Sequence, residues 1–176
     1  MEKEASRTAR NVQSALSQEL RNASAYRLYA RSARDEGYLQ IADLFSETAQ
    51  NELEHASLLW ELSAQCRTAS TAENLAAALE AETHSGYETY AAEAEAEGLP
   101  ETAYLFRQLL GVEKNHARRF RILAENLRTG AAFQKEQDCY WICRVCGALH
   151  RSRTAPQTCP VCGYPQSCFS LYAEDF

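Results

Sequence analysis

Two groups of acidic and imidazole side chains recur with the same spacing in this 176-residue chain. The first group is Glu19, Glu52 and His55, and the second is Glu80, Glu113 and His116. In both groups 33 residues separate the first Glu from the second, and the His follows three residues later. A Glu and a His three residues apart share one side of a helix. Pairs of iron or manganese ions in helical bundles are held by such motifs together with further carboxylates. The spacing therefore predicts a diiron site.

The two halves of the chain that carry these groups resemble each other. Residues 19–56 and 80–117, laid over one another at a constant offset of 61, share many identities, among them Tyr26 with Tyr87. Each half contains a glycine, Gly37 or Gly98, where a helix can end in the left-handed conformation. We therefore expect a duplicated helical hairpin, with helices near 6–36, 38–65, 71–97 and 100–128.

Apolar or small residues recur at helical spacing in all four predicted helices and should form the core of a bundle. The acidic residues fall on these stripes; Glu19, for example, lies between Leu16 and Ala23. Carboxylates in a core must be neutralised by protons, basic partners or metal. Because no Lys or Arg lies on the stripes, metal is the interpretation we favour. A single Glu-x-x-His pair would more simply be a solvated helix face, but a matched pair is not.

Four cysteines near the C-terminus form a second metal motif. They are arranged as two Cys-x-x-Cys-Gly sequences, Cys143 with Cys146 and Cys159 with Cys162. Such knuckles supply four thiolates in a tetrahedral array, and each glycine allows a tight turn. Four sulfur ligands suit zinc and iron equally.

The residues around these cysteines resemble rubredoxin: Tyr140 and Trp141 precede the first knuckle, Pro160 lies in the second, and Phe169 follows it. Together with the preceding diiron motif, the chain from about Arg7 to Phe169 resembles the rubrerythrins. The resemblance implies a mainly α fold, in which a ferritin-like four-helix bundle is followed by a small rubredoxin-like domain. We assign residues 1–130 to the bundle, 131–138 to a linker without helical periodicity, and 139–176 to the Fe(Cys)4 domain, which is small enough to need its metal to fold.

The resemblance also implies a role for each candidate ligand. Glu52 and Glu113 would bridge two irons, Glu19 and Glu80 would be terminal carboxylates, and His55 and His116 terminal imidazoles. Cys143, Cys146, Cys159 and Cys162 would hold a single iron.

The third helix departs from the family pattern, because rubrerythrins usually offer two carboxylates three residues apart and the residue three after Glu80 is Thr83. Glu82, sixteen residues before Gly98, is an alternative ligand, but its register places Leu79 at the first position. The gapless repeat favours Glu80 and a symmetric site, as in bacterioferritins.

Other side chains near the predicted site have two interpretations each. Tyr26 and Tyr87 could donate hydrogen bonds to carboxylate ligands, or they are ordinary core aromatics. His84, one turn after Glu80, could approach iron or relay protons, although an exposed or outer histidine is the simpler interpretation. His150 is expected at the surface near the rubredoxin centre.

By resemblance, the function is that of a non-haem diiron peroxidase, which reduces hydrogen peroxide to water in oxidative-stress defence. An Fe(Cys)4 centre has no open coordination position, so it can carry electrons but cannot bind peroxide. Electrons would come from a separate NAD(P)H-linked reductase, since the chain has no nucleotide motif. The alternatives are a ferroxidase or oxygen reductase with the same site, and a non-catalytic metal-binding or redox-signalling module.

The composition limits the classes of partner and the cell compartments that we expect for this protein. The net charge of −6 argues against a nucleic-acid partner, and no segment has the pattern of a signal peptide or membrane helix. Of seven cysteines, four are assigned to iron, which leaves Cys66, Cys139 and Cys168. An odd remainder fits free thiols and a reducing compartment. We therefore expect a cytoplasmic protein.

The connection between the two halves predicts the oligomeric state. In a ferritin-like bundle the second and third helices run in the same direction, so the chain must return along the bundle. If these helices end at Gln65 and begin at Thr71, their ends lie roughly 15 Å and 13 Å on opposite sides of the site. Six extended residues reach at most ~21 Å. We therefore expect a homodimer that is domain-swapped between 65 and 71. The alternative is unravelled helix ends or an up-and-down topology, with one site in each protomer.

Overall fold

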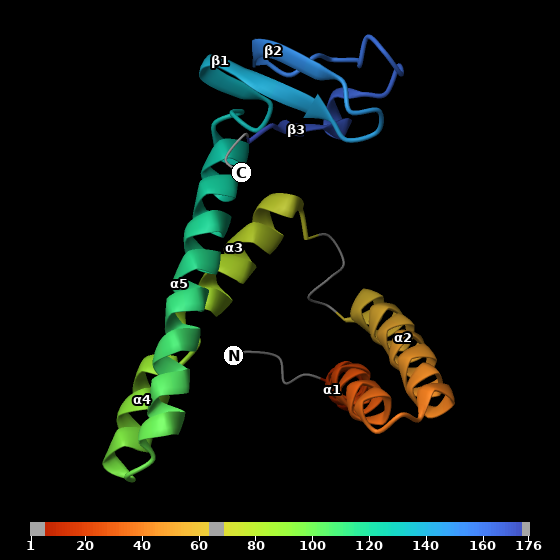
Figure 1. Ribbon diagram of the computed structural model, residues 1–176, viewed down its shortest axis with the longest axis vertical. Helices are drawn as coiled ribbons and strands as arrows, with labels where there is room; N and C mark the ends of the chain where they lie inside the picture. The colour runs from red at the N-terminus through yellow and green to blue at the C-terminus, as the bar shows by residue number, and fades with distance from the viewer. Residues whose placement is uncertain (1–5, 64–68, 174–176) are drawn as a thin grey trace. The chain divides into compact units, whose positions relative to one another are not determined.

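The computed structural model describes residues 6–63 and 69–173 and contains five α-helices followed by a small sheet (Figure 1). The chain divides into two compact units, Met1–Ala69 and Ser70–Phe176, which are described separately below. In the described part of the chain no helix is long and apolar enough to cross a membrane.

The first unit is a helical hairpin. Helices α1 (Arg7–Asp35) and α2 (Leu39–Leu62) pack against each other, and the chain turns between them at Gly37, whose φ of 86° is left-handed. Buried residues recur every seven positions on both helices, the spacing that keeps two helices in contact. They are Leu16, Ala23 and Ala30 on α1, and Ala42, Ala49 and Ala56 on α2. Both helices therefore form where the sequence predicts them.

The contact between α1 and α2 buries mostly alanines, and many large apolar side chains of this hairpin remain exposed. They include Leu28, Tyr29, Leu44, Leu58, Trp60 and Leu62. Ile41, which helical spacing places on the apolar stripe of α2, is exposed in this unit. A two-helix hairpin that buries small residues and exposes large ones has apolar surface left for another element to cover.

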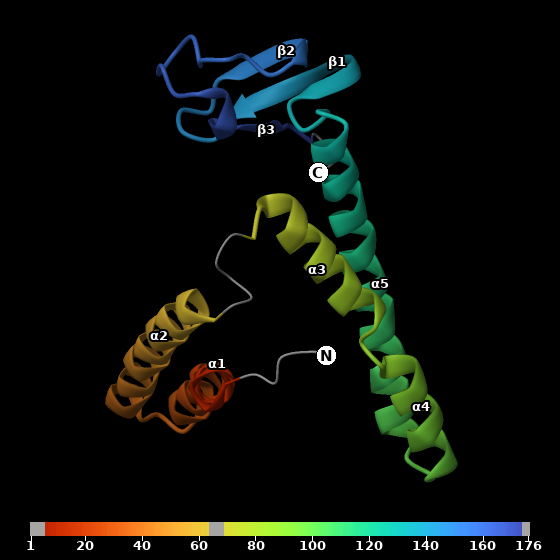
Figure 2. The same ribbon diagram turned by 180° about the vertical axis from the view of Figure 1, so that it is seen from behind.

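The second unit begins with a helix that is broken where the sequence predicts continuity. Instead of one helix over 71–97, the structure has α3 (Thr71–Thr83) and α4 (Tyr87–Ala96), both packed on α5 (Pro100–Arg128) (Figures 1 and 2). The break occurs because His84 leaves helical geometry, with ψ of 36°, and Gly86 is left-handed, with φ of 78°. A capping box between Ser70 and Glu73 starts α3.

The junction between the two units differs slightly from expectation. α2 ends at Leu62, three residues before the predicted end, and α3 begins at Thr71 as predicted. Residues 64–68, which include Cys66 and most of the predicted crossover, lie outside the described residues.

The C-terminal part of the second unit is an antiparallel sheet of order β2-β1-β3, made of β1 (Gln134–Cys143), β2 (Leu149–Thr154) and β3 (Phe169–Leu171). A short 3₁₀ helix, η1 (Gln166–Cys168), precedes β3. The core is Trp141, Cys143, Ala155, Cys159 and Phe169. The predicted linker 131–138 is largely strand, because β1 begins at Gln134 and pairs there with Thr154.

Candidate metal centres

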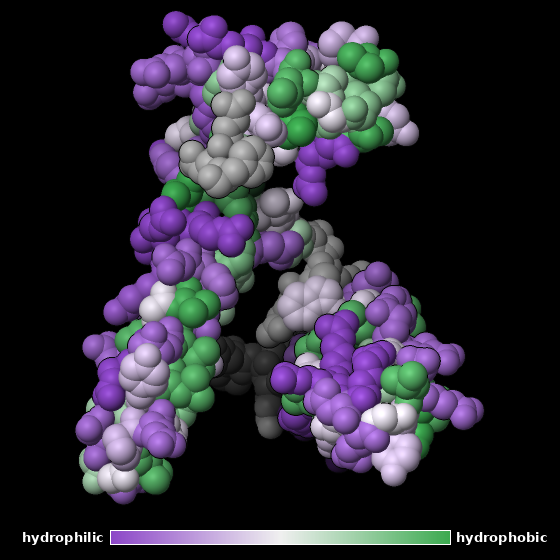
Figure 3. All heavy atoms as spheres, viewed as in Figure 1, coloured by the Kyte–Doolittle hydropathy of each residue, from purple (hydrophilic) through white to green (hydrophobic). Residues whose placement is uncertain are grey.

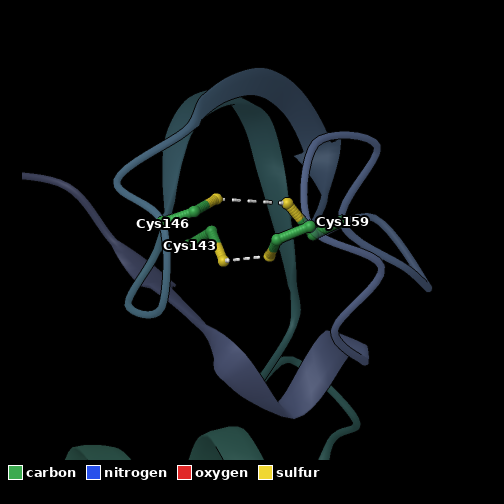
Figure 4. Close-up of side chains that lie close together, drawn as sticks. Cys143, Cys146 and Cys159 are labelled. Atoms are coloured by element: carbon green, nitrogen blue, oxygen red, sulfur yellow. Dashed lines mark hydrogen bonds between the residues drawn. The ribbon is translucent and has the colours of Figure 1, made fainter.

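The four cysteines converge between the two knuckle loops. Figure 4 shows that the sulfurs face one another across a small gap. The Sγ atoms of Cys143 and Cys162 are 3.7 Å apart, as are those of Cys146 and Cys159. A tetrahedral site with metal–sulfur bonds of ~2.3 Å has sulfur–sulfur edges of about 3.8 Å. The spacing therefore fits a four-coordinate metal, and no disulfide joins any described cysteine.

Backbone amides prepare these thiols for deprotonation. The amides of Cys146 and Val145 lower the pKa of Cys143, and those of Cys162 and Val161 lower the pKa of Cys159 to about 6. The Tyr164 amide lowers the pKa of Cys162, but burial and the neighbouring thiols outweigh it and raise the value to about 12. Four crowded thiols cannot all ionise on their own, whereas a bound cation would let them do so.

The first carboxylate group lies between α1 and α2. One ligand atom each from Glu19, Glu52 and His55 lies within 4.8 Å of the others. His55 Nδ1 is 3.0 Å from Glu52 Oε2 and 3.7 Å from Glu19 Oε2. The Glu52 side chain is only 16% exposed, and the Glu19 side chain is 24% exposed. All three predicted residues of the first half are therefore brought together.

Glu19 and Glu52 lie so close together that two charged carboxylates would repel each other. A hydrogen bond between them raises the pKa of Glu19, with burial adding to the effect, and lowers the pKa of Glu52, with His55 adding to that effect. Among the described residues, no Lys or Arg forms an ion pair with either. The raised pKa of Glu19 favours a proton between the two carboxyl groups in the metal-free protein, and a metal cation could take that position.

The second group, between α3 and α5, contains Glu82 rather than Glu80. Ligand atoms of Glu82, Glu113 and His116 lie within 4.8 Å of one another, and His116 Nδ1 is 3.3 Å from a carboxylate oxygen of each Glu. A hydrogen bond to Glu82 raises the pKa of Glu113, and burial adds to the rise. Glu80 is exposed and does not belong to this group.

The helix break explains why Glu82 takes this place. On the C-terminal side of the break the repeat keeps its offset of 61. Tyr26 lies 6.1 Å from Phe45 between ring centroids, and Tyr87 lies 5.8 Å from Phe106. On the N-terminal side the offset becomes 63, because Glu82 lies in the second group where Glu19 lies in the first. Non-helical residues rise up to ~3.3 Å each against ~1.5 Å in a helix, so fewer residues span the same length.

The remaining predicted residues are placed as follows. Tyr26 and Tyr87 contact neighbouring aromatic rings, and within the described chain neither hydroxyl has a hydrogen-bond partner. The His84 Nδ1 atom lies 3.0 Å from the carbonyl oxygen of Glu80, and His84 belongs to neither carboxylate group. His150 is exposed, as predicted.

Comparison with known proteins agrees with both metal motifs. The family model described as rubrerythrin matches residues 10–74 and again 73–140, once in each half, and the model for the rubredoxin-like domain of rubrerythrin matches residues 141–170. The chain is a member of the rubrerythrin family.

Individual rubrerythrins are similar over nearly their whole length. Rubrerythrin from Porphyromonas gingivalis is 37% identical, covering 93% of this chain and 89% of its own. Rubrerythrin from Nitratidesulfovibrio vulgaris is 34% identical, over 94% of both chains. Rubrerythrin-1 from Clostridium acetobutylicum is 31% identical, over 97% of this chain and 96% of its own.

Membership and geometry together give the cofactors. This rubrerythrin has a carboxylate and histidine site for two irons and a rubredoxin-like site of four cysteines. The resemblance also offered Glu82, through its distance from Gly98, and Glu82 is the residue that lies beside Glu113 and His116 in the structure. The exact repeat between the halves pointed to Glu80 instead.

The break at 84–86 is open to a direct test with the substitution Gly86→Ala. An added Cβ would lie 2.8 Å from ring atoms of Tyr90, in a backbone conformation that L-residues avoid. We expect a loss of roughly 1–2 kcal/mol in unfolding free energy, together with reduced iron at the carboxylate site and an unchanged Fe(Cys)4 band. Thermal unfolding and metal analysis measure the two effects.

Gly98→Ala is the matched control for this substitution. Gly98 has nearly the same φ, 76°, but an added Cβ would meet no atom within 4 Å. If both variants lost the same stability and kept full iron, the contact at Gly86 and the break would have no role in placing Glu82.

Proposed function

We propose that this rubrerythrin is a non-haem diiron peroxidase that reduces hydrogen peroxide to water. The observation that carries the proposal is the presence, in one chain, of two groups of two Glu and one His and a separate four-cysteine centre. Two irons would supply two electrons together, which is the requirement for cleaving the O–O bond without releasing a radical. The four-cysteine centre has no open position, and so it serves only to deliver electrons.

In this proposal each carboxylate group supplies one half of the metal site. Glu52 and Glu113 would be shared between the two irons, Glu19 and Glu82 would each hold one iron, and so would His55 and His116. Glu80, the residue that the internal repeat favours, would not be a ligand. Cys143, Cys146, Cys159 and Cys162 would hold the single iron.

Binding of a cation would change the protonation of the carboxylates in the site. In the metal-free protein the neighbouring carboxyl group raises the pKa of Glu19 and that of Glu113. A cation held by these ligands would favour their charged form instead. Reduction of peroxide to two waters consumes two protons, and these two carboxyl groups, as ligands, would not be their source. The aromatic rings of Tyr26 and Tyr87 pack against Phe45 and Phe106.

We further propose that two chains complete each other's sites as a domain-swapped homodimer. The connection from Leu62 to Thr71 reaches at most ~31 Å. The helix ends lie roughly 10 Å beyond His55 and 17 Å before Glu82, on opposite sides of the site. With the helix ends of the structure the connection is long enough to return within one chain, which the six residues of the predicted crossover were not, but it must then be nearly straight. Swapping removes that requirement and covers the apolar faces of both hairpins.

The proposal places the protein with a separate reductase linked to NAD(P)H, in the cytoplasm. Free thiols at Cys139 and Cys168 fit a reducing compartment.

Stopped-flow oxidation tests the proposed reaction. The iron-loaded protein is reduced without oxygen and then mixed with hydrogen peroxide or, separately, with dioxygen, while the visible band of the Fe(Cys)4 centre is followed. We expect peroxide to reoxidise the protein at least ten times faster, because two ferrous irons supply the two electrons that peroxide needs, whereas reduction of dioxygen to water needs four. Equal or faster oxidation by dioxygen would instead indicate an oxygen reductase or ferroxidase, and no oxidation by either would indicate a non-catalytic module.

A further inference from the structure

Charge is unevenly distributed along the chain. Residues 1–138 contain 15 basic and 22 acidic residues, whereas residues 139–173 contain three arginines and no Asp or Glu. The three are Arg144, Arg151 and Arg153. The segment 139–173, which holds all four cysteines, therefore carries only positive charge, although Glu136, Asp138, Glu174 and Asp175 flank it in the sequence.

The strand register places two of these arginines on one face of the sheet. Trp141, which pairs with His150, is buried in the core. Because side chains alternate along a strand, the neighbouring pair Tyr140 and Arg151 lies on the opposite, outer face. Arg153, two residues further along β2, lies on that face too. Both arginines are exposed, and neither forms an ion pair with any described carboxylate.

The third arginine lies in the first knuckle, beside the cysteine ligands. Arg144 directly follows Cys143, is exposed, and has its backbone N–H fixed by the carbonyl of Cys168 at 2.9 Å. Apolar side chains are exposed at the tips of both knuckles, where Val145 is 50% and Val161 72% exposed. In Figure 3 hydrophobic surface gathers toward one end of this domain, and hydrophilic surface covers the other. The centre thus has exposed apolar residues and one exposed arginine, Arg144, beside its ligands.

We propose that Arg144, Arg151 and Arg153 form a docking surface for an electron-transfer protein with an acidic surface. The inference rests on the proposed role of the four-cysteine centre as the entry point for electrons. Transient redox complexes bury small interfaces and depend on complementary charge for fast association. Exposed arginines in the same domain as a one-electron centre, one of them directly beside a ligand, are suited to attracting carboxylates on a donor and to orienting that donor. In the transfer the donor is oxidised by one electron and the ferric centre becomes ferrous, without any proton.

The test measures reduction of the centre without any peroxide. The full-length, iron-loaded protein is mixed under anaerobic conditions with a reduced ferredoxin of strongly negative charge and, separately, with the cation radical of methyl viologen. We expect the ferredoxin rate constant to fall about tenfold as salt rises from low to roughly 0.3 M, because screening weakens opposite charges. The methyl viologen rate should not fall, since the donor and the surface carry the same sign.

Variants identify the surface. The triple substitution R144Q/R151Q/R153Q should lower the ferredoxin rate about tenfold at low salt and remove most of its salt dependence. The matched control R7Q/R27Q/R31Q removes three exposed arginines from α1 and should change the rate less than twofold. The midpoint potential and visible band of each variant separate docking from a change in the iron centre itself.

The outcomes are distinct from those of the peroxidase test. The docking surface would be overturned if ferredoxin reduced R144Q/R151Q/R153Q at the wild-type rate. It would also be overturned if R7Q/R27Q/R31Q lost as much of that rate as R144Q/R151Q/R153Q. A protein that accepts electrons as described but does not react with peroxide would overturn only the peroxidase proposal.

Discussion

Mixing a chain that lacks Glu52 with a chain that lacks Glu113 should restore an iron site and peroxide turnover that neither chain has alone. In a domain-swapped dimer each site combines the first hairpin of one chain with the second hairpin of the other. A heterodimer of E52A and E113A chains therefore contains one site with both changes and one site with neither. After joint unfolding and refolding, random pairing should return roughly a quarter of the wild-type activity.

The control for this experiment uses two changes in the same hairpin. E19A and E52A chains, mixed and refolded in the same way, leave one altered residue in every site and should restore nothing. Iron content and peroxide turnover are measured on the refolded dimers, together with their mass by sedimentation. A dimer that forms without restored activity, or an active monomer, would show that each chain builds its own site.

The sequence predicts which helices and cysteine loops form better than it predicts where each helix or strand begins, ends or breaks. The seven-residue spacing of Ala42, Ala49 and Ala56 is a local pattern, and the hairpin follows from it directly. The four cysteines were equally predictable, because two short loops with fixed turns leave little freedom in how their sulfurs meet.

Two features could not be read from periodicity because they depend on competition between local geometries. A helix through 84–86 would satisfy the repeat, yet Gly86 can take a left-handed φ at little cost and the chain breaks there. Similarly, 131–138 lacks helical pattern, and only the pairing of Gln134 with Thr154 shows that strand begins inside it. The strand could be recognised only with knowledge of a partner that lies elsewhere in the chain.

The choice between Glu82 and Glu80 gives the second large expected effect. E82A should lose iron from the carboxylate site, with an affinity loss at least as large as the ~10–100-fold typical of removing a partner of a ligand. E80A, a change of the same kind two residues away on an exposed side chain, should keep iron within about twofold of wild type. Metal analysis after dialysis against a graded chelator measures both variants.

A second readout does not depend on iron. In the metal-free protein the hydrogen bond to Glu82 raises the pKa of Glu113, so E82A should return that pKa toward its ordinary value while E80A leaves it raised. Titration of Glu113 followed by NMR measures the difference. Loss of iron in E80A, with E82A unaffected, would mean that the metal-bound protein repairs the helix break and restores the register of the repeat. Glu82 would then lie beside Glu113 and His116 only in the metal-free arrangement, and the break itself would be the element that iron binding moves.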